Sequence, residues 1–352
     1  MASSKLPPTM KAAAWHSTAG GIDKNLKPTT THPLPKNAHS LPKDSTLVRV
    51  AYASLNPVDY KVPEMPLLGR LAFSSGVPGL DFSGTVVATT STSPDLQPGA
   101  RVFGMLAPPF GGTLGEYVVV GGGRQGCIAV PEGVESRDAA TLGVACLTAW
   151  QTIAPFVTKS AVQGGGSNSK VFINGGSGGV GSYQIQIAKL LGCHVTVSCS
   201  GANVEFCKSL GADEVIDYRT EDLVQALTRK GQAFDLIADN VFNNGAQLYW
   251  ACAKYLKPEG TYVTIAGSPS LDMVRTFLSV MFWPKVLGGG ERKFKFVTCV
   301  ANPEEFAQLA AWMAEGKLKA CIEREFGLEE AGEAYTRLKS GRTRGKLVVK
   351  VT

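Results

Sequence analysis

Short apolar runs alternate with amphipathic stretches over residues 170–218, the most regular hydrophobic pattern in the chain. The run at 171–173 is too short for a helix and is typical of a buried strand. Apolar residues at helical spacing occupy 180–191, where Gly192 predicts the end of the helix, and 194–199 predicts a second strand. The first turn holds glycines at G-x-x-G-x-x-G spacing, at Gly175, Gly178 and Gly181. The pattern therefore predicts a strand, a glycine turn, a helix and a strand.

The glycine turn suits the close approach of a phosphate group. At this spacing the first two glycines let the backbone turn tightly and approach a pyrophosphate, and the third lets the helix pack against the strand. The helix then points free N–H groups and its positive dipole end at the phosphates. A glycine turn that only connects a strand to a helix is the alternative. The residues of this turn expected to bind the cofactor are Gly175, Ser177, Gly178, Gly179 and Val180.

Upstream of the glycine turn, the hydrophobic pattern is alternating. It predicts strands at 47–52, 82–88 and 116–120. Ser136 is expected to cap a helix that continues to Ile153. Residues 1–140 are therefore expected to form a β-rich domain.

Downstream, strand signals recur between helical stretches. They lie at 170–174, 194–199, 214–216, 234–238, 261–265 and 294–300. Six strands separated by helices make a doubly wound parallel sheet. The tail predicts two helices and a closing strand, at 303–315, 328–338 and 346–351. The predicted fold class is α/β, with a Rossmann sheet domain at 141–300 and a β-rich domain of 1–140 to which 301–352 return.

Composition agrees with two domains. A chain of 352 residues is long for one core, and 44% hydrophobic residues are enough to bury two. No apolar run reaches the roughly 18 residues of a membrane span, and the N-terminus lacks the apolar region of a secretory signal. The eight cysteines show no C-x-x-C pair or metal-ligand spacing, so reduced thiols in a cytoplasmic protein are expected. The net charge of +6 is scattered, which favours anionic ligands mildly and does not favour nucleic acid.

Seven motifs in a fixed order carry a family resemblance. They are SLNPVDYK (54–61), PGLDFSG (78–84), GGTLGEY (111–117), LTAW (147–150), GGSGGVG (175–181), SLGADEVIDY (209–218) and RGKLVV (344–349). Together they resemble the medium-chain dehydrogenase/reductase superfamily. Within it the chain is most similar to the zinc-free quinone oxidoreductases and alkenal/enone reductases, including the chloroplast-envelope group and fungal relatives. The resemblance implies a GroES-like, partly barrel-shaped catalytic domain beside the Rossmann domain.

The zinc alcohol dehydrogenases of this superfamily differ where they bind metal. Their catalytic ligand positions fall at Asn56, at Leu80 within residues 79–81, and near Val144. Asn, Leu and Val cannot supply the three or four ligands that zinc needs, so no metal site is expected. The expected reaction is hydride transfer to an acceptor that is already electrophilic, a quinone or a C=C conjugated to a carbonyl.

The end of the second strand bears on the choice of cofactor. An NAD enzyme usually has an acid there to hold the ribose hydroxyls, whereas this chain continues with Ser200 and Asn203, which can donate hydrogen bonds. The resemblance places Lys208 and Tyr218 near the phosphate and the adenine. NADPH is therefore expected. The turn at 201–203 lacks the Lys or Arg of many relatives, which weakens that preference by about ten- to a hundredfold.

The resemblance also places residues around the nicotinamide: Asn56, Thr148, Asn240, Ala266 and Lys346. From the sequence alone, Asn56 could be a turn residue before a proline, Thr148 a helix hydroxyl bonded to its own backbone, and Lys346 a charge at a strand edge.

Hydride addition leaves an oxyanion that must be stabilised and protonated. Tyr60 is the candidate proton donor and Lys61 the candidate stabiliser, with Asp59 orienting either. The alternative is that Tyr60 packs in the core, that Asp59 and Lys61 form a surface ion pair, and that water protonates the product.

Several large apolar side chains suit an acceptor pocket or, alternatively, the core. They are Met65, Phe110, Trp150, Phe282 and Trp283. The stretch 273–295 joins apolar bulk to a basic end, which suggests a lid or a peripheral membrane contact, with a packed surface segment as the alternative.

These observations predict an NADPH-dependent reductase of a small apolar quinone, enal or enone. An enoyl reductase dedicated to a pathway of secondary metabolism would share every motif. A cofactor-binding protein with a structural, RNA-associated or membrane-associated role is a further alternative. The resemblance leaves a homodimer open.

Overall fold

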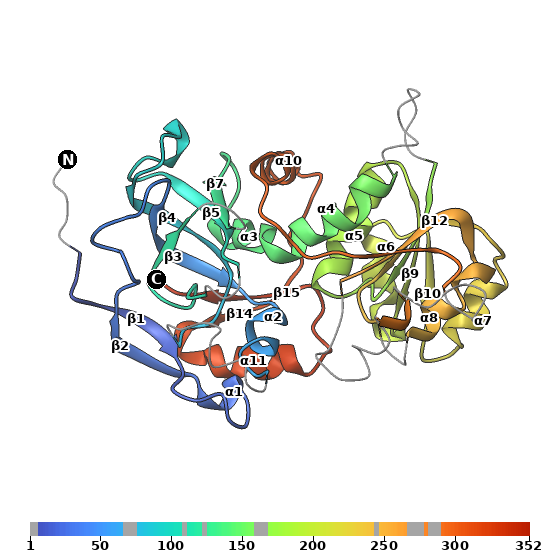
Figure 1. Cartoon of the computed structure of the whole chain (residues 1–352), viewed down its shortest axis with the longest axis horizontal. Coiled ribbons are helices and arrows are strands. Elements are labelled where there is room, and N and C mark those ends of the chain that lie inside the picture. Colours follow the sequence, from blue (N-terminus) through green and yellow to red (C-terminus); the bar gives the residue numbers. More distant parts are fainter. Residues whose placement is uncertain are drawn as a thin grey trace. The chain divides into compact units, whose positions relative to one another are not determined.

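The computed structural model of the chain describes residues 6–65, 76–107, 111–121, 125–157, 168–242, 246–265, 278–280 and 290–352. The chain divides into two compact units (Figure 1). The first unit comprises Met1–Leu147 and Val300–Thr352, and the second comprises Thr148–Cys299.

The second unit contains a parallel sheet of six strands. Its strands are β8 (Lys170–Asn174), β9 (His194–Cys199), β10 (Glu214–Asp217), β11 (Phe234–Asp239), β12 (Leu256–Thr264) and β13 (Lys293–Phe296). Their spatial order is β10-β9-β8-β11-β12-β13, the doubly wound order of a dinucleotide-binding domain. The predicted Rossmann sheet is confirmed. The order reverses between β8 and β11, and ligands bind such sheets at the carboxyl ends of the strands beside this point.

One helix precedes the strands of the second unit, and the others lie between them in the sequence. They are α4 (Val144–Val157), which begins in the first unit, α5 (Gly179–Leu190), α6 (Val204–Ser209), α7 (Leu223–Thr228) and α8 (Gln247–Trp250), with the 3-10 turns η4 (Gly201–Asn203) and η6 (Cys252–Lys254). Helix α5 packs on β8 and β9. Its end is confirmed by Gly192, whose φ of 80° only glycine adopts readily.

The first unit is built on a mainly antiparallel sheet of seven strands. They are β3 (Thr46–Ser54), β4 (Asp81–Thr89), β5 (Arg101–Met105), β6 (Tyr117–Val120), β7 (Gly126–Ala129), β14 (Ile322–Gly327) and β15 (Lys346–Lys350). A separate pair joins β1 (Thr9–Ala14) to β2 (Lys27–Pro33). The tail strand β15 pairs with β3, so the red end of the chain lies among the blue strands in Figure 1.

Short helices complete the first unit. They are α1 (Ile22–Asn25), α2 (Val58–Lys61), α3 (Ser136–Ala139), α10 (Pro303–Ala314) and α11 (Ala331–Lys339), with the 3-10 turns η1 (Pro94–Leu96), η2 (Ala140–Leu142) and η8 (Leu328–Glu330). The buried core includes side chains from β3, β4, β15 and α11, such as Val50, Phe82, Tyr335 and Leu347.

The helix predicted from Ser136 is different in the structure. Ser136 lies inside α3, whose N-cap is Glu135, and the helix is broken at Gly143 before α4 begins. The break frees the N–H of Val144, which donates to Asp81 Oδ1 at 2.7 Å. A side chain at residue 143 would place its Cβ 2.3 Å from that oxygen, so only glycine fits. The prediction of one continuous helix is therefore wrong, because the backbone N–H of Val144 bonds to the buried Asp81 carboxylate instead of continuing the helix.

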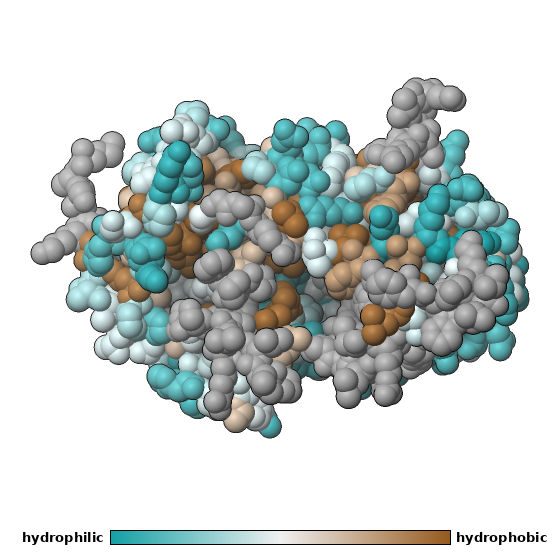
Figure 2. Space-filling model, viewed as in Figure 1, coloured by the Kyte–Doolittle hydropathy of each residue, from teal (hydrophilic) through white to brown (hydrophobic). Residues whose placement is uncertain are grey.

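Polar side chains cover much of the visible face of the described residues, with smaller hydrophobic patches between them (Figure 2). No single helix among the described residues has both the length and the hydropathy of a membrane span. The bent pair 136–142 and 144–157, at 47° to each other, passes the same test only when its parts are joined.

Candidate active site

The glycine turn of the second unit contains glycines of two kinds. A side chain at Gly181 would place its Cβ 2.2 Å from Gly175 O, and one at Gly176 would lie 2.8 Å from Val197 Cβ. Both glycines are therefore required by packing. At Gly178 the nearest atom to a Cβ would be 3.6 Å away, an ordinary contact, so packing does not require glycine there. The space beside Gly178 is free, so a ligand can approach the backbone there. The packing role of Gly176 was missed because this glycine lies outside the G-x-x-G-x-x-G spacing.

Helix α5 begins at this turn with free backbone donors. Its N-cap Gly178 supplies no side-chain acceptor, and the first intrahelical bond runs from Ser182 N to Gly178 O at 2.9 Å. The N–H groups of Gly179, Val180 and Gly181 therefore lack partners within the helix. Backbone donors at the positive end of a twelve-residue helix are suited to an anion such as a pyrophosphate.

Three predicted cofactor residues meet beside the turn. Asn203 Nδ2 donates to Ser177 Oγ at 3.2 Å and to Ser200 Oγ at 3.3 Å. All three are partly exposed, so their remaining polar capacity is open to a ligand. Lys208 instead pairs with Glu205 at 3.0 Å on the surface of α6. Tyr218 follows β10 and is 51% exposed.

The strand ends below the turn form a polar network that sequence reasoning missed. Asn174 Nδ2 donates to Asp239 Oδ1 at 2.7 Å, and Ser198 Oγ donates to Asn174 Oδ1 at 2.6 Å. Gly175 N donates to Ser198 Oγ at 3.1 Å, which ties the network to the turn. The only signal in the sequence is a polar residue at or next to the last position of each apolar strand. The network fixes the turn on β8, β9 and β11.

Asn240 follows β11 and joins a second chain of amides. Its Nδ2 donates to Gln184 Oε1 at 2.7 Å, and Gln184 Nε2 donates to Thr152 Oγ1 at 2.8 Å. Thr152 in turn bonds to the carbonyl of Thr148. Among the described residues, Asn240 Oδ1 is buried without a hydrogen-bond partner, so it can accept from a ligand. Ala266 lies outside the described residues.

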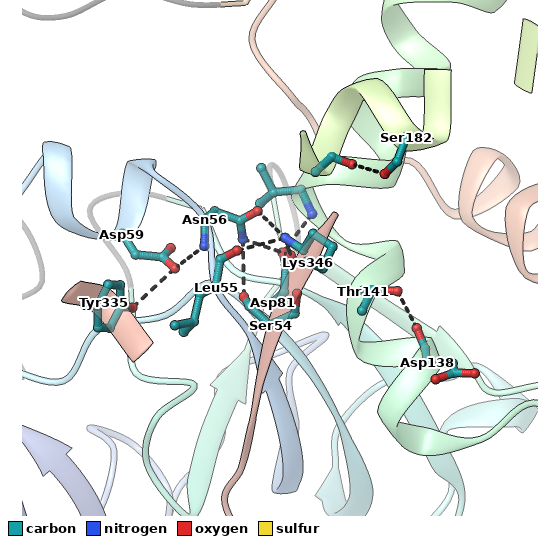
Figure 3. A network of polar contacts seen from close by, with 12 residues as sticks. Ser54, Leu55, Asn56, Asp59, Asp81, Asp138, Thr141, Ser182, Tyr335 and Lys346 are labelled. Carbon is teal, nitrogen blue, oxygen red and sulfur yellow. Dashed lines mark hydrogen bonds and ion pairs between the residues drawn. The ribbon is translucent and has the colours of Figure 1, made fainter. Parts of the chain in front are cut away.

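The first unit holds a separate buried cluster around Asn56 (Figure 3). Asn56 Oδ1 accepts from Lys346 Nζ at 2.6 Å, and Asn56 Nδ2 donates to Asp81 Oδ2 at 2.8 Å. Asn56 is only 3% exposed. Both ends of its amide are therefore held by neighbours from β15 and β4, and its contact with a nicotinamide stays a prediction.

Lys346 is the buried cation of this cluster. It is 3% exposed, donates to Leu55 O at 2.9 Å, and lies 3.6 Å from Asp81 Oδ2. Burial lowers the pKa of Lys346, and the Asp81 carboxylate opposes that shift. Burial likewise raises the pKa of Asp81, and Lys346 opposes it. Since β15 lies between β3 and β14, the alternative of a charge at a strand edge is wrong.

Asp59 belongs to the same cluster. Its side chain is fully buried, and its Oδ2 accepts from Asn56 N at 2.8 Å and from Tyr335 OH at 3.3 Å. Because it is buried, the alternative of a surface ion pair between Asp59 and Lys61 is wrong. Burial raises the pKa of Asp59 to about 8, with a further contribution from the Asp81 charge.

Because the pKa of Asp59 is raised in the folded chain, the stability of the native chain should fall as pH rises, and Asp59→Asn should remove this loss. The carboxyl ionises near its ordinary pKa of 3.8 in the unfolded chain and near 8 in the folded chain. Between these values the folded state binds more protons, so stability falls as pH rises and levels off above 8. The melting temperature of Asp59→Asn relative to the native chain should therefore rise by roughly 2–6 °C from about pH 5 to about pH 8.

Asp59→Ala is the control, because it leaves Asn56 N and Tyr335 OH without their acceptor and should be less stable at every pH. A difference between Asp59→Asn and the native chain that stays constant with pH would contradict the shift.

Tyr60 and Lys61, the candidate catalytic residues, are partly buried on α2. The Tyr60 ring packs against the core of the first unit, and Lys339 Nζ lies 5.5 Å from its centroid. Burial raises the pKa of Tyr60, opposed by the Lys339 charge, and burial lowers the pKa of Lys61. Tyr60 therefore carries its proton at neutral pH. The carboxylate of Asp59 faces Asn56 and Tyr335 rather than orienting either residue.

The apolar pocket expected from the sequence is described only in part. Met65 and Trp150 are partly exposed, whereas Phe110, Phe282 and Trp283 lie outside the described residues. Of 273–295, only 278–280 and 290–295 are described, so the lid and the membrane contact stay predictions.

No three His, Cys, Asp or Glu side chains gather to hold a metal in the part of the chain that the structure describes. Two of the positions matched to zinc ligands, Asn56 and Val144, bond within the buried cluster, and the third, Leu80, lies in the hydrophobic core. Asn56 bonds to Asp81 and Lys346, and the backbone of Val144 bonds to Asp81.

Known proteins share both the sequence and the fold. The family model "Alcohol dehydrogenase GroES-like domain" matches residues 42–132, and "Zinc-binding dehydrogenase" matches 210–349. The trans-enoyl reductase pgmF of Aspergillus terreus is 42% identical, over 99% of this chain and 98% of that protein. The chloroplastic quinone-oxidoreductase homolog of Spinacia oleracea is 30% identical, over 97% and 98%. The structure of the quinone oxidoreductase from Coxiella burnetii matches with a TM-score of 0.78 at 30% identity, over 97% of this chain and 99% of that one.

The chain combines a doubly wound sheet, a glycine turn suited to a phosphate, and a GroES-like unit. This combination defines an oxidoreductase that uses a nicotinamide cofactor. The chain belongs to the medium-chain dehydrogenase/reductase superfamily, in its zinc-free quinone oxidoreductase group.

Proposed function

We propose that this chain is an NADPH-dependent reductase that transfers a hydride to a quinone or to the C=C of an α,β-unsaturated carbonyl. The observation that carries the proposal is the buried cluster in which Asn56, Asp81 and Lys346 bond to one another. Asn56 stands where the zinc dehydrogenases have a ligand, and its amide is engaged with Asp81 and Lys346, so an acceptor that needs no Lewis acid is favoured. The names of the two similar proteins, an enoyl reductase and a quinone oxidoreductase, support the same acceptors.

The reduced nicotinamide would supply the hydride. The chain would bind the pyrophosphate with the free N–H groups of Gly179, Val180 and Gly181, and the adenosine phosphate with Ser177, Ser200 and Asn203. Hydroxyl and amide donors together with Lys208 support NADPH over NADH. Asn240 Oδ1, buried and unpartnered among the described residues, is a further acceptor for the cofactor.

The chain would also supply the proton. Addition of hydride to the β-carbon of an enone moves an electron pair to the carbonyl oxygen, and the resulting enolate is protonated. Tyr60 holds its proton because burial raises its pKa, and the partly buried Lys61 can stabilise the developing oxyanion. The product then leaves with one hydride and one proton added.

An isotope experiment tests the type of reaction. With deuterium at the transferring position of NADPH, the label should appear on the β-carbon of a reduced enone, because hydride addition at that carbon is the proposed step. The product is analysed by NMR, with unlabelled NADPH as the control. Label on the carbonyl carbon would mean ketone reduction, and the proposal would be abandoned.

A dedicated enoyl reductase of a biosynthetic pathway is the second candidate. The identity of 42% with a trans-enoyl reductase over nearly the whole chain favours it. A panel of free quinones, enals and enones, compared with enoyl thioesters at equal NADPH, separates the candidates. Turnover confined to thioesters would favour the dedicated enzyme. A protein that binds NADPH and turns over none of them would fit the structural alternative.

A further inference from the structure

A carboxylate from the neighbouring strand lies against the turn that follows β9. Asp217, the last residue of β10, is paired in register with Cys199, the last residue of β9. A Cβ built on Gly201 would lie 2.6 Å from Asp217 Oδ2. The sequence has no acid at the end of the second strand, yet the fold brings one there from the third.

The other groups of this turn make the position of Asp217 specific. Ser200 and Asn203, which bond to each other, flank the glycine that Asp217 faces. Asp217 Oδ1 accepts the backbone N–H of Arg219 at 3.0 Å, so one oxygen shapes its own turn while the other faces Gly201. The basic Lys208 is paired with Glu205, which partly neutralises it.

We propose that Asp217 limits the preference of this chain for NADPH over NADH. It accepts hydrogen bonds from the adenosine ribose hydroxyls and repels a 2′-phosphate, so it favours NADH and narrows the margin of NADPH. This rests on the proposed function, because it assigns part of the same cofactor site. A carboxylate beside the second strand is the group that recognises a ribose diol, and two anions in one place repel each other strongly. A side chain at Gly201 would have to displace the Asp217 carboxylate.

Asp217→Asn tests the charge without changing the shape. The amide oxygen still accepts from Arg219 N, so the turn is retained. The dissociation constants of NADPH and NADH are measured on the full chain by fluorescence titration, at low salt and at high salt. The constant for NADPH should fall by about tenfold at low salt and by less at high salt, while that for NADH stays the same or rises a few fold.

Two further variants serve as controls. One removes a different negative charge, and the other removes the positive charge of Lys208. Glu221→Gln loses the same charge a few residues away, from a carboxylate paired with Arg229, and should not change the ratio of the two constants. Lys208→Ala should weaken NADPH and spare NADH. If Glu221→Gln reproduced the effect of Asp217→Asn, or if Asp217→Asn changed both cofactors equally, the assignment of Asp217 would be overturned. A native chain that bound neither dinucleotide would overturn the proposed function itself.

Discussion

Gly178→Val is expected to abolish dinucleotide binding, with a loss of more than about 100-fold in affinity, while the second unit stays folded. Valine fits the backbone there, since Gly178 has an extended φ of −78° and ψ of 178°, and its Cβ would meet only Gly175 O at 3.6 Å. The two added methyl groups would instead occupy the space in front of the free N–H groups of α5. Cofactor titration and thermal melting are measured on the same sample.

Gly181→Val is the matched control for this experiment. The valine side chain would collide with the backbone of Gly175 and Gly176. Gly181→Val should therefore lower the melting temperature, whereas Gly178→Val should not. If Gly178→Val bound NADPH as tightly as the native chain, the glycine turn would be only a structural connector.

Tyr60→Phe should lower the turnover number for an enone by about 10²–10⁴ and leave the affinity for cofactor nearly unchanged, as expected for loss of a general acid. Phenylalanine keeps the ring and its packing, so only the hydroxyl group and its proton are lost. Quinones should respond less, because their reduced oxyanions are better stabilised without help from the protein. Steady-state rates with one enone and one quinone at saturating NADPH give the comparison.

Tyr52→Phe, a hydroxyl removed from β3 in the same unit, should change the rate by less than about twofold. A loss of only a few fold in Tyr60→Phe would instead make water the proton donor, and Tyr60 would then be a packing residue beneath Lys339.

The second unit was the part of the fold most open to prediction from sequence. The helix predicted at 180–191 is α5 (Gly179–Leu190), because an apolar helical period and a glycine at each end are local signals.

Strand β14 of the first unit was missed, since charged Arg324 and Glu325 interrupt its apolar pattern. It lies at the edge of its sheet, where those side chains face water and no alternation is required.

The sequence indicated several residues of the candidate site but not the contacts between them. The resemblance pointed to Asn56 and Lys346, but neither residue carries a local signal for the other. Asp217 and Asp239 were missed for the same reason, because each lies against the end of another strand: Asp217 faces Gly201 after β9, and Asp239 accepts from Asn174 of β8. Spacing along the chain reports a period within one element, whereas these polar contacts depend on the order in which the strands pair.

The link between Lys346 and Asn56 spans 290 residues, and that between Tyr335 and Asp59 spans 276. A ribosome releases Asn56 290 residues before Lys346. The second unit is one continuous segment and can complete its sheet while synthesis continues, whereas β3 must wait for β15. Until β15 emerges, two buried carboxyls and an amide in the first unit have no cation beside them, so these polar core positions of the nascent chain stay incomplete while 290 residues are made.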